Sequence, residues 1–191
     1  MIPERAIKGR TMFTKSILLT AMSLTISTGS FGQLNSKMKS INENAPVKCS
    51  KTITIDAPGE TVWAVLSNIN NWATWQTDIS KPRLNGELKP ATTFDWKTGG
   101  AKIHSTLHTV EPNKELGWTG KTLGMFAIHN WTLTETNGIT NVRVDESMEG
   151  FLAGLFKKSF NKNLENGMLN WLDLLKKECE KQPKPVSNKE H

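Results

Sequence analysis

The stretch AIHNWTLTETNGITNVRVDESM, residues 127–148, alternates apolar and polar side chains on both sides of Asn137-Gly138. A period of two is typical of a half-buried strand, and Asn-Gly favours a two-residue type I′ turn. Such a turn pairs Leu133 with Val142, Trp131 with Val144, His129 with Glu146 and Ala127 with Met148. One face of the predicted hairpin is then apolar except for His129 and Glu146. A shift of one residue would mix apolar and polar residues on both faces.

The same alternation extends back from this hairpin to residue 78. Turn signals at Asn85-Gly86, Gly99-Gly100, Pro112-Asn113 and Leu123-Gly124 divide it into an antiparallel meander of about six strands. Two-residue turns at Gly99-Gly100 and Pro112-Asn113 predict further pairs, which are Trp96 with Ile103, Phe94 with Ser105, and Leu107 with Trp118. The inner face of the predicted sheet collects Phe94, Trp96, Ile103, Ser105, Leu107, Trp118, His129, Trp131, Glu146 and Met148.

The flanks of the meander predict one more strand and several helices. Residues 51–55 form a strand that stops at Ala57-Pro58, and residues 61–67 and 70–76 form two short helices. From Phe151 the period becomes helical over about 30 positions, on Leu152, Phe156, Phe160, Leu164, Met168, Leu172 and Leu175. The sequence therefore predicts an α+β fold, in which a curved antiparallel sheet of about seven strands wraps around a long C-terminal helix.

Gly167 interrupts the predicted C-terminal helix, at a cost of about 1 kcal/mol relative to alanine. A glycine at such a position either permits close contact with the sheet or leaves space for a ligand. Of these two interpretations we expect close contact with the sheet.

The N-terminal 32 residues read as a signal peptide. Residues 16–26 are an apolar run of 11, too short for the ~20 residues that span a bilayer, and small Ser30 and Gly32 predict cleavage before Gln33. The chain is therefore expected to be exported to the periplasm or secreted, with no stable membrane span. An uncleaved interfacial helix is the alternative, and Met12 is an alternative start.

The rest of the chain divides into three predicted parts. Residues 33–47 are rich in Asn, Ser and Lys and read as a flexible linker, 48–180 as the folded ligand-binding domain, and 181–191 as a disordered tail. Cys49 begins the first strand and Cys179 ends the last helix, so two separate thiols are favoured over a disulfide.

The charge of the chain argues against nucleic-acid binding. The formal net charge is +6, but four of the 24 basic residues and only one of the 18 acidic residues lie before residue 33, which leaves +3 for the remainder. Nucleic-acid binding requires a clustered basic face, which the sequence does not show.

No cofactor or metal is expected. His104 and His108 resemble a metal-binding pair, but four residues along a strand separate them by about 13 Å, too far for one ion. Both fall on the predicted solvent-facing side, where His104 faces Asp95 as a weak surface pair.

The indoles of Trp96, Trp118 and Trp131 lie on one inner face and predict an apolar pocket between the sheet and the C-terminal helix. The alternative is that these rings only fill the core. The predicted ligand-binding residues are Phe94, Trp96, Ser105, Trp118, His129, Trp131, Glu146 and Met148.

His129 and Glu146 are the polar exception on the apolar face. A buried carboxylate needs a partner, and a histidine directly opposite supplies one. Three interpretations remain open, namely a polar pair that satisfies itself within the sheet, a pair that positions a ligand, and an acid/base pair in catalysis.

A set of short motifs resembles a known superfamily and covers about residues 48–178. The motifs are Ile55-Asp56-Ala57-Pro58, Val62-Trp63 with Leu66, Asn71-Trp72 with Trp75, Leu84-Asn85-Gly86, Phe94-Asp95-Trp96-Lys97, Val110-Glu111-Pro112, His129-Asn130-Trp131 and Glu146-Ser147-Met148-Glu149-Gly150. In these motifs and in its order of elements the chain resembles the helix-grip fold of the START and birch-allergen (SRPBCC) superfamily, in its polyketide cyclase/dehydrase and lipid-transport branch. The resemblance implies a pocket for a hydrophobic ligand, and some members act as aromatase/cyclases, dehydratases or hydrolases.

Three hypotheses for function follow. The first is an exported binding or carrier protein for a lipid-like or aromatic molecule. The second is a cyclase, dehydratase or hydrolase that uses His129 and Glu146 as an acid/base pair on a hydrophobic substrate. The third is an interaction module of the cell envelope whose cavity is incidental.

Overall fold

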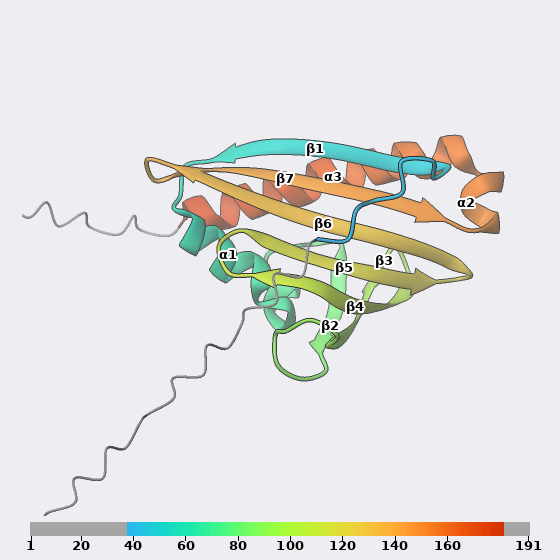
Figure 1. Cartoon of the computed structure of the whole chain (residues 1–191), viewed down its shortest axis with the longest axis horizontal. Helices are drawn as coiled ribbons and strands as arrows, with labels where there is room; N and C mark the ends of the chain where they lie inside the picture. The colour runs from blue at the N-terminus through green and yellow to red at the C-terminus, as the bar shows by residue number, and fades with distance from the viewer. Residues whose placement is uncertain (1–37, 182–191) are drawn as a thin grey trace, which may run out of the picture. The chain divides into compact units, whose positions relative to one another are not determined.

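The computed structural model describes residues 38–181, which form a single antiparallel sheet and four helical segments (Figure 1). The predicted signal peptide, the predicted linker up to residue 37 and the predicted tail beyond residue 181 lie outside the described residues.

The α+β fold predicted from the sequence is confirmed. Its elements in chain order are β1 (Val47–Ile55), α1 (Gly59–Ser67), the 3-10 helix η1 (Ile69–Thr74), β2 (Ile79–Leu84), β3 (Thr93–Thr98), β4 (Ala101–Glu111), β5 (Glu115–Thr122), β6 (Met125–Thr136), β7 (Ile139–Glu149), α2 (Phe151–Leu155) and α3 (Lys157–Glu180). The seven strands follow the order β1-β7-β6-β5-β4-β3-β2, so only β1 leaves the meander order and pairs with β7. In Figure 1, α3 runs along one face of this sheet.

The pairing predicted across Asn137-Gly138 is confirmed. Both turn residues have positive φ, 52° and 77°, as a type I′ turn requires. His129 pairs with Glu146 in the β6–β7 ladder, and the pairs predicted for the β3–β4 hairpin are also present. The inward face of the central strands is therefore the one predicted from the sequence.

In the β4–β5 hairpin the predicted pairs near the centre are present, although the turn differs from the predicted two-residue turn. The turn holds three residues instead of two, because Glu111 pairs with Glu115, and the ladder shifts by one residue between Leu107 and Thr109. These two irregularities cancel, so Leu107 still pairs with Trp118. His108 is the extra residue of this bulge.

The two histidines predicted on the solvent-facing side both lie there, but they differ in exposure. His104 is exposed and its imidazole bonds Asp95 at 2.9 Å, as expected. His108 is only partly exposed, its Nδ1 contacts Thr109 Oγ1 at 2.9 Å, and burial lowers the pKa of its imidazole to about 4. Its ring lies where a side chain on Gly117 would have to lie.

Gly117→Ala is therefore expected to destabilise the protein by about 1–3 kcal/mol, because the added methyl group would overlap the His108 ring and lie 2.8 Å from Asn130 Oδ1. Urea unfolding followed by circular dichroism measures this loss. Gly154→Ala in α2 is the matched control, since nothing lies within 4 Å of its added Cβ. Equal stability of the two variants would contradict this packing of His108.

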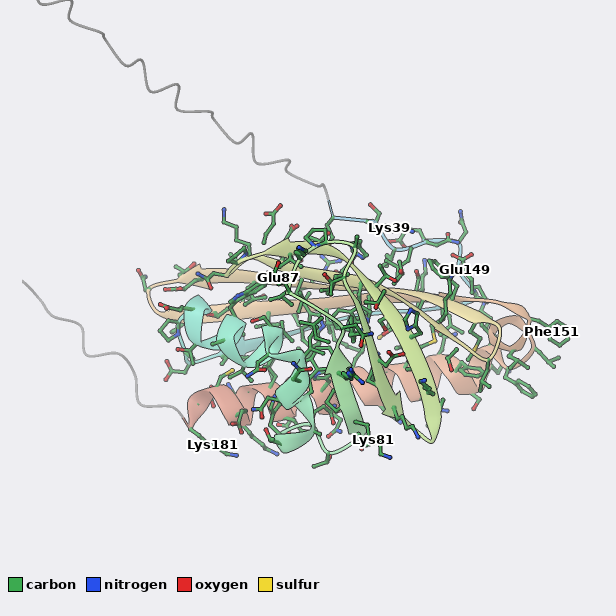
Figure 2. All side chains as sticks on the ribbon, turned by 90° about the horizontal axis from the view of Figure 1, so that it is seen from below. Lys39, Lys81, Glu87, Glu149, Phe151 and Lys181 are labelled. Carbon is green, nitrogen blue, oxygen red and sulfur yellow. The ribbon has the colours of Figure 1, made fainter. Side chains whose placement is uncertain are left out.

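Residues 38–47 belong to the folded domain, which differs from the flexible linker predicted from their composition. The side-chain amide of Asn42 donates to Glu149 at 2.8 Å, and that of Asn130 donates to the backbone carbonyl of Lys39 at 2.8 Å. Figure 2 shows Lys39 on the side of the sheet opposite α3. The segment thus covers part of the outer face of β6 and β7.

The predicted long C-terminal helix is divided into α2 and α3. Phe156 leaves helical geometry at φ −108° and ψ 32°, and it is 52% exposed, so it does not join the buried stripe that the helical period predicts. From Leu164 onward the predicted stripe is buried, on Leu164, Met168, Leu172 and Leu175, and Trp171 and Cys179 are buried beside it. Phe151, on α2, projects from the end of the molecule (Figure 2). Both thiols, on β1 and α3, are free.

Candidate ligand-binding pocket

A cavity of about 280 Å³ lies between the sheet and α3. The sheet contributes Trp96, Trp118, Ala127, His129, Glu146 and Met148 among others, and α3 contributes Phe160, Leu164, Gly167, Met168 and Trp171. Most of these side chains are apolar, and the polar ones are few. A concave apolar surface with a small number of polar groups is typical of a small-molecule site.

Small residues on both walls create this space. Gly120 on β5 pairs with Ala127 on β6, and both line the cavity. No large side chain therefore projects from the sheet at this point. On the helix side, no atom lies within 4 Å of the position that a Cβ on Gly167 would occupy. The close contact expected for Gly167 is therefore wrong, and this glycine leaves space instead.

One opening of the cavity, called the mouth below, lies between the β3–β4 turn and α3. A surface hollow at this turn shares Asp78, Thr98, Asn163 and Gly167 with the cavity. The side-chain amide of Asn170 donates to Asp78 at 2.7 Å and so ties α3 to the start of β2 beside the opening. The mouth is thus polar while the interior is apolar.

Trp171 is the centre of the aromatic wall. Its ring lies 5.4–6.2 Å, centroid to centroid, from those of Trp72, Trp96, Trp118, His129 and Trp131. Aromatic rings at these separations attract one another beyond the effect of their buried area. This cluster joins η1, the three strands β3, β5 and β6, and α3 around the cavity.

The His129–Glu146 pair predicted from the hairpin is formed. His129 Nδ1 lies 2.5 Å from Glu146 Oε2, and the two residues are 4% and 8% exposed. The imidazole also stacks on Trp118, with centroids 4.3 Å apart and planes 12° apart. Because an ionised carboxylate only accepts hydrogen bonds, it holds the proton on Nδ1 and leaves Nε2 as the second functional atom of the ring.

The eight residues predicted to bind ligand occupy two layers. Five of them line the cavity, and these are Trp96, Trp118, His129, Glu146 and Met148. The other three are fully buried behind it, and these are Phe94, Ser105 and Trp131. Ser105 Oγ accepts a hydrogen bond from Trp96 Nε1 at 3.0 Å, so it orients a wall residue without lining the cavity itself.

Trp171 was missed by the sequence analysis, which followed Leu172 along the helical stripe. Its spacing offered a signal, because it lies seven residues after Leu164 and three after Met168, and so on the same face of α3. Gln76 and Asp78 also line the cavity and carry no comparable pattern in the sequence.

Neither a metal site nor a membrane helix is found among residues 38–181. No cluster of three or more His, Cys, Asp or Glu side chains in this range has the geometry to hold a metal ion. No helix in the same part of the chain is long and apolar enough to cross a bilayer.

His129→Phe is expected to destabilise the protein by about 1–3 kcal/mol, because it leaves the buried Glu146 carboxylate without its partner. His129→Phe/Glu146→Leu should recover part of that loss, since the second change removes the stranded charge. Thermal melting of the single and double variants measures both effects. A double variant that is less stable than His129→Phe alone would contradict a mutual pairing of these side chains.

The arrangement of sheet, helix and cavity agrees with a comparison to known families. The sequence model of the family described as polyketide cyclase/dehydrase and lipid transport matches residues 46–180. The chain belongs to this family. The match runs from the residue before β1 to the last residue of α3. Among curated proteins, none matches the chain significantly.

Solved structures similar to this family member share the helix-grip fold of the START/SRPBCC superfamily. The Zhui aromatase/cyclase from Streptomyces sp. R1128 is 12% identical, with a TM-score of 0.64 over 73% of this chain and 97% of the other. A START superfamily protein from Mycobacterium smegmatis is 14% identical, with a TM-score of 0.61 over 70% and 97%. A hypothetical protein from Helicobacter pylori is 19% identical, with a TM-score of 0.64 over 72% and 95%. At these identities the likeness establishes the fold.

Proposed function

We propose that this family member is an exported binding or carrier protein that holds a lipid-like or aromatic molecule between its sheet and α3. The observation that carries the proposal is the apolar cavity, which is walled by Trp96, Trp118 and Trp171 and contains one buried polar pair. The family description, which includes lipid transport, agrees with this use of the fold.

The cavity limits the size of the ligand. Its volume of about 280 Å³ lies at the lower end of the ~300–1,000 Å³ typical of small-molecule pockets. This space suits a small ring system or a short acyl chain. A longer chain would extend through the mouth beside Gly167.

Titration with N-phenylnaphthylamine, an apolar fluorescent molecule, tests the proposal. Its emission should rise saturably when Trp is excited, because the bound molecule lies beside the three indoles of the wall. Trp118→Ala should weaken binding, whereas Trp63→Ala, on α1 and outside the cavity lining, should not. Absence of saturable binding to the wild-type protein would contradict the proposal.

Export is proposed from residues 1–32 alone, whose apolar run and small Ser30 and Gly32 are typical of a signal peptide. N-terminal sequencing of the protein from its native host should then begin at or near Gln33. Intact residues 12–32 on a soluble cytoplasmic product would contradict export.

A catalytic role is the second candidate, and the 2.5 Å His129–Glu146 pair on the cavity wall is the observation that favours it. A carboxylate that holds the Nδ1 proton leaves Nε2 free to accept a proton from a bound substrate. Glu146→Gln keeps the shape of the side chain and removes its charge. Loss of turnover in Glu146→Gln with an unchanged melting temperature would support catalysis. If neither the wild-type protein nor Glu146→Gln turns over substrate and both bind ligand equally, only the carrier function would stand.

A further inference from the structure

Three buried ring nitrogens around the cavity have no hydrogen-bond partner among the described residues. They are Nε2 of His129 and Nε1 of Trp131 and Trp171. The three rings form a compact group, with centroids 5.5–5.6 Å apart. An unsatisfied buried polar atom carries a desolvation penalty, and most such atoms in native proteins have a partner. A group of three beside a cavity points to a polar atom of the ligand.

The geometry of His129 directs Nε2 away from Glu146. Nδ1 adjoins Cγ and is held by Glu146, so Nε2 lies at the opposite end of the ring. His129 and Trp171 both line the cavity, whereas Trp131 does not. When the ring carries one proton and Nδ1 donates it to Glu146, Nε2 presents a lone pair. The indole of Trp171 presents an N–H.

A hydroxyl group matches both atoms at once, because it donates one hydrogen bond and accepts another. An ether, ester or ketone only accepts, so it would leave the Nε2 lone pair unpaired. A carboxylate would bring a second negative charge into a buried site that already holds Glu146. A ligand hydroxyl also reproduces both bonds of any water that occupies the position, and so displaces it without loss.

We propose that the pocket selects apolar molecules that carry one hydroxyl, a phenol or an alcohol, and holds this group at the buried end between His129 Nε2 and the Trp171 indole N–H. The inference rests on the proposed binding function and specifies its ligand class. It assigns the His129–Glu146 pair a positioning role, since Glu146 sets which ring nitrogen carries the proton.

Two probes that differ only at the oxygen test the selection. Isothermal titration with para-hexylphenol and para-hexylanisole, which replaces the hydroxyl by a methyl ether, should show at least tenfold tighter binding of the phenol to the wild-type protein. In His129→Phe the phenol should lose this advantage while the anisole still binds. Trp171→Phe keeps an aromatic ring but removes the N–H and should reduce the preference. Trp131→Phe is the matched control and should retain it.

The outcomes separate this inference from the function on which it rests. Equal affinity of the two probes for the wild-type protein, or tighter binding of the anisole, would overturn the hydroxyl selection and leave the carrier function intact. Absence of binding by both probes and by N-phenylnaphthylamine would overturn the two together. Because the wild-type comparison and Trp171→Phe each decide the question, the test does not depend on the stability of His129→Phe.

Discussion

Replacing Trp171 by alanine is expected to remove about 3–5 kcal/mol from the free energy of unfolding, the largest single loss we expect in this protein. The indole is 7% exposed and its ring packs against five other rings. Truncation would therefore leave an unfilled space beside the existing cavity, and the surrounding strands could not close it without breaking their ladder. Urea unfolding followed by far-ultraviolet circular dichroism measures the loss independently of Trp fluorescence.

Leu169→Ala is the control for this prediction. Leu169 lies on the same helix but is 48% exposed, so its truncation should change stability by less than about 1 kcal/mol. Similar losses for the two variants would show that α3 is sensitive to any truncation, and that the aromatic cluster is not its main attachment to the sheet.

Gly167→Leu is expected to weaken binding of N-phenylnaphthylamine at least tenfold while the fold is retained. Gly167 lines both the cavity and the hollow at its mouth, and no atom lies within 4 Å of an added Cβ. A leucine side chain would occupy this space without overlapping the sheet. It would compete with the ligand for a volume of only about 280 Å³.

Gly167→Ala separates the effect of the helix from the effect of the volume. Alanine should stabilise α3 by up to about 1 kcal/mol and leave most of the space free, so binding should be close to that of the wild type. Unchanged probe affinity in a folded Gly167→Leu variant would place the ligand outside the mouth described here.

The strand register was the part of the fold most open to prediction from the sequence. Asn137-Gly138 allows few turn geometries, and the alternation on either side excludes a shift of one residue, so the facing of His129 and Glu146 followed from local rules. For the β4–β5 hairpin the same rule succeeded only because an extra turn residue and the bulge at His108 offset each other. His108 faces outward as predicted, and its partial burial depends on neighbours on β5 and β6 that local alternation does not specify.

The remaining differences depend on contacts between distant parts of the chain. Hydrogen bonds from Asn42 to Glu149, and from Asn130 to Lys39, hold a segment whose composition suggests a linker. At Phe156 the helical period of the sequence continues although the helix itself is interrupted. Neither periodicity nor composition contains this information.

The candidate site was predictable on the sheet side and not on the helix side. Inward-facing strand residues follow from alternation, so five of the eight predicted residues line the cavity. The rotation of α3 about its axis relative to the sheet is set by packing, and it decides that Trp171 and Gly167 face the cavity. Ser105 and Trp131 were predicted on the correct face, but both are fully buried and neither lines the cavity.

Native mass spectrometry of the protein purified from its own host, without detergent or organic solvent, tests the central claim most directly. We predict that the wild-type protein carries one small apolar molecule, which is released by organic extraction and is absent from the Gly167→Leu variant purified in parallel. A wild-type protein that carries no such molecule and also fails to bind N-phenylnaphthylamine would contradict the account. So would an equal amount of the same molecule on both proteins, because the molecule would then be bound elsewhere.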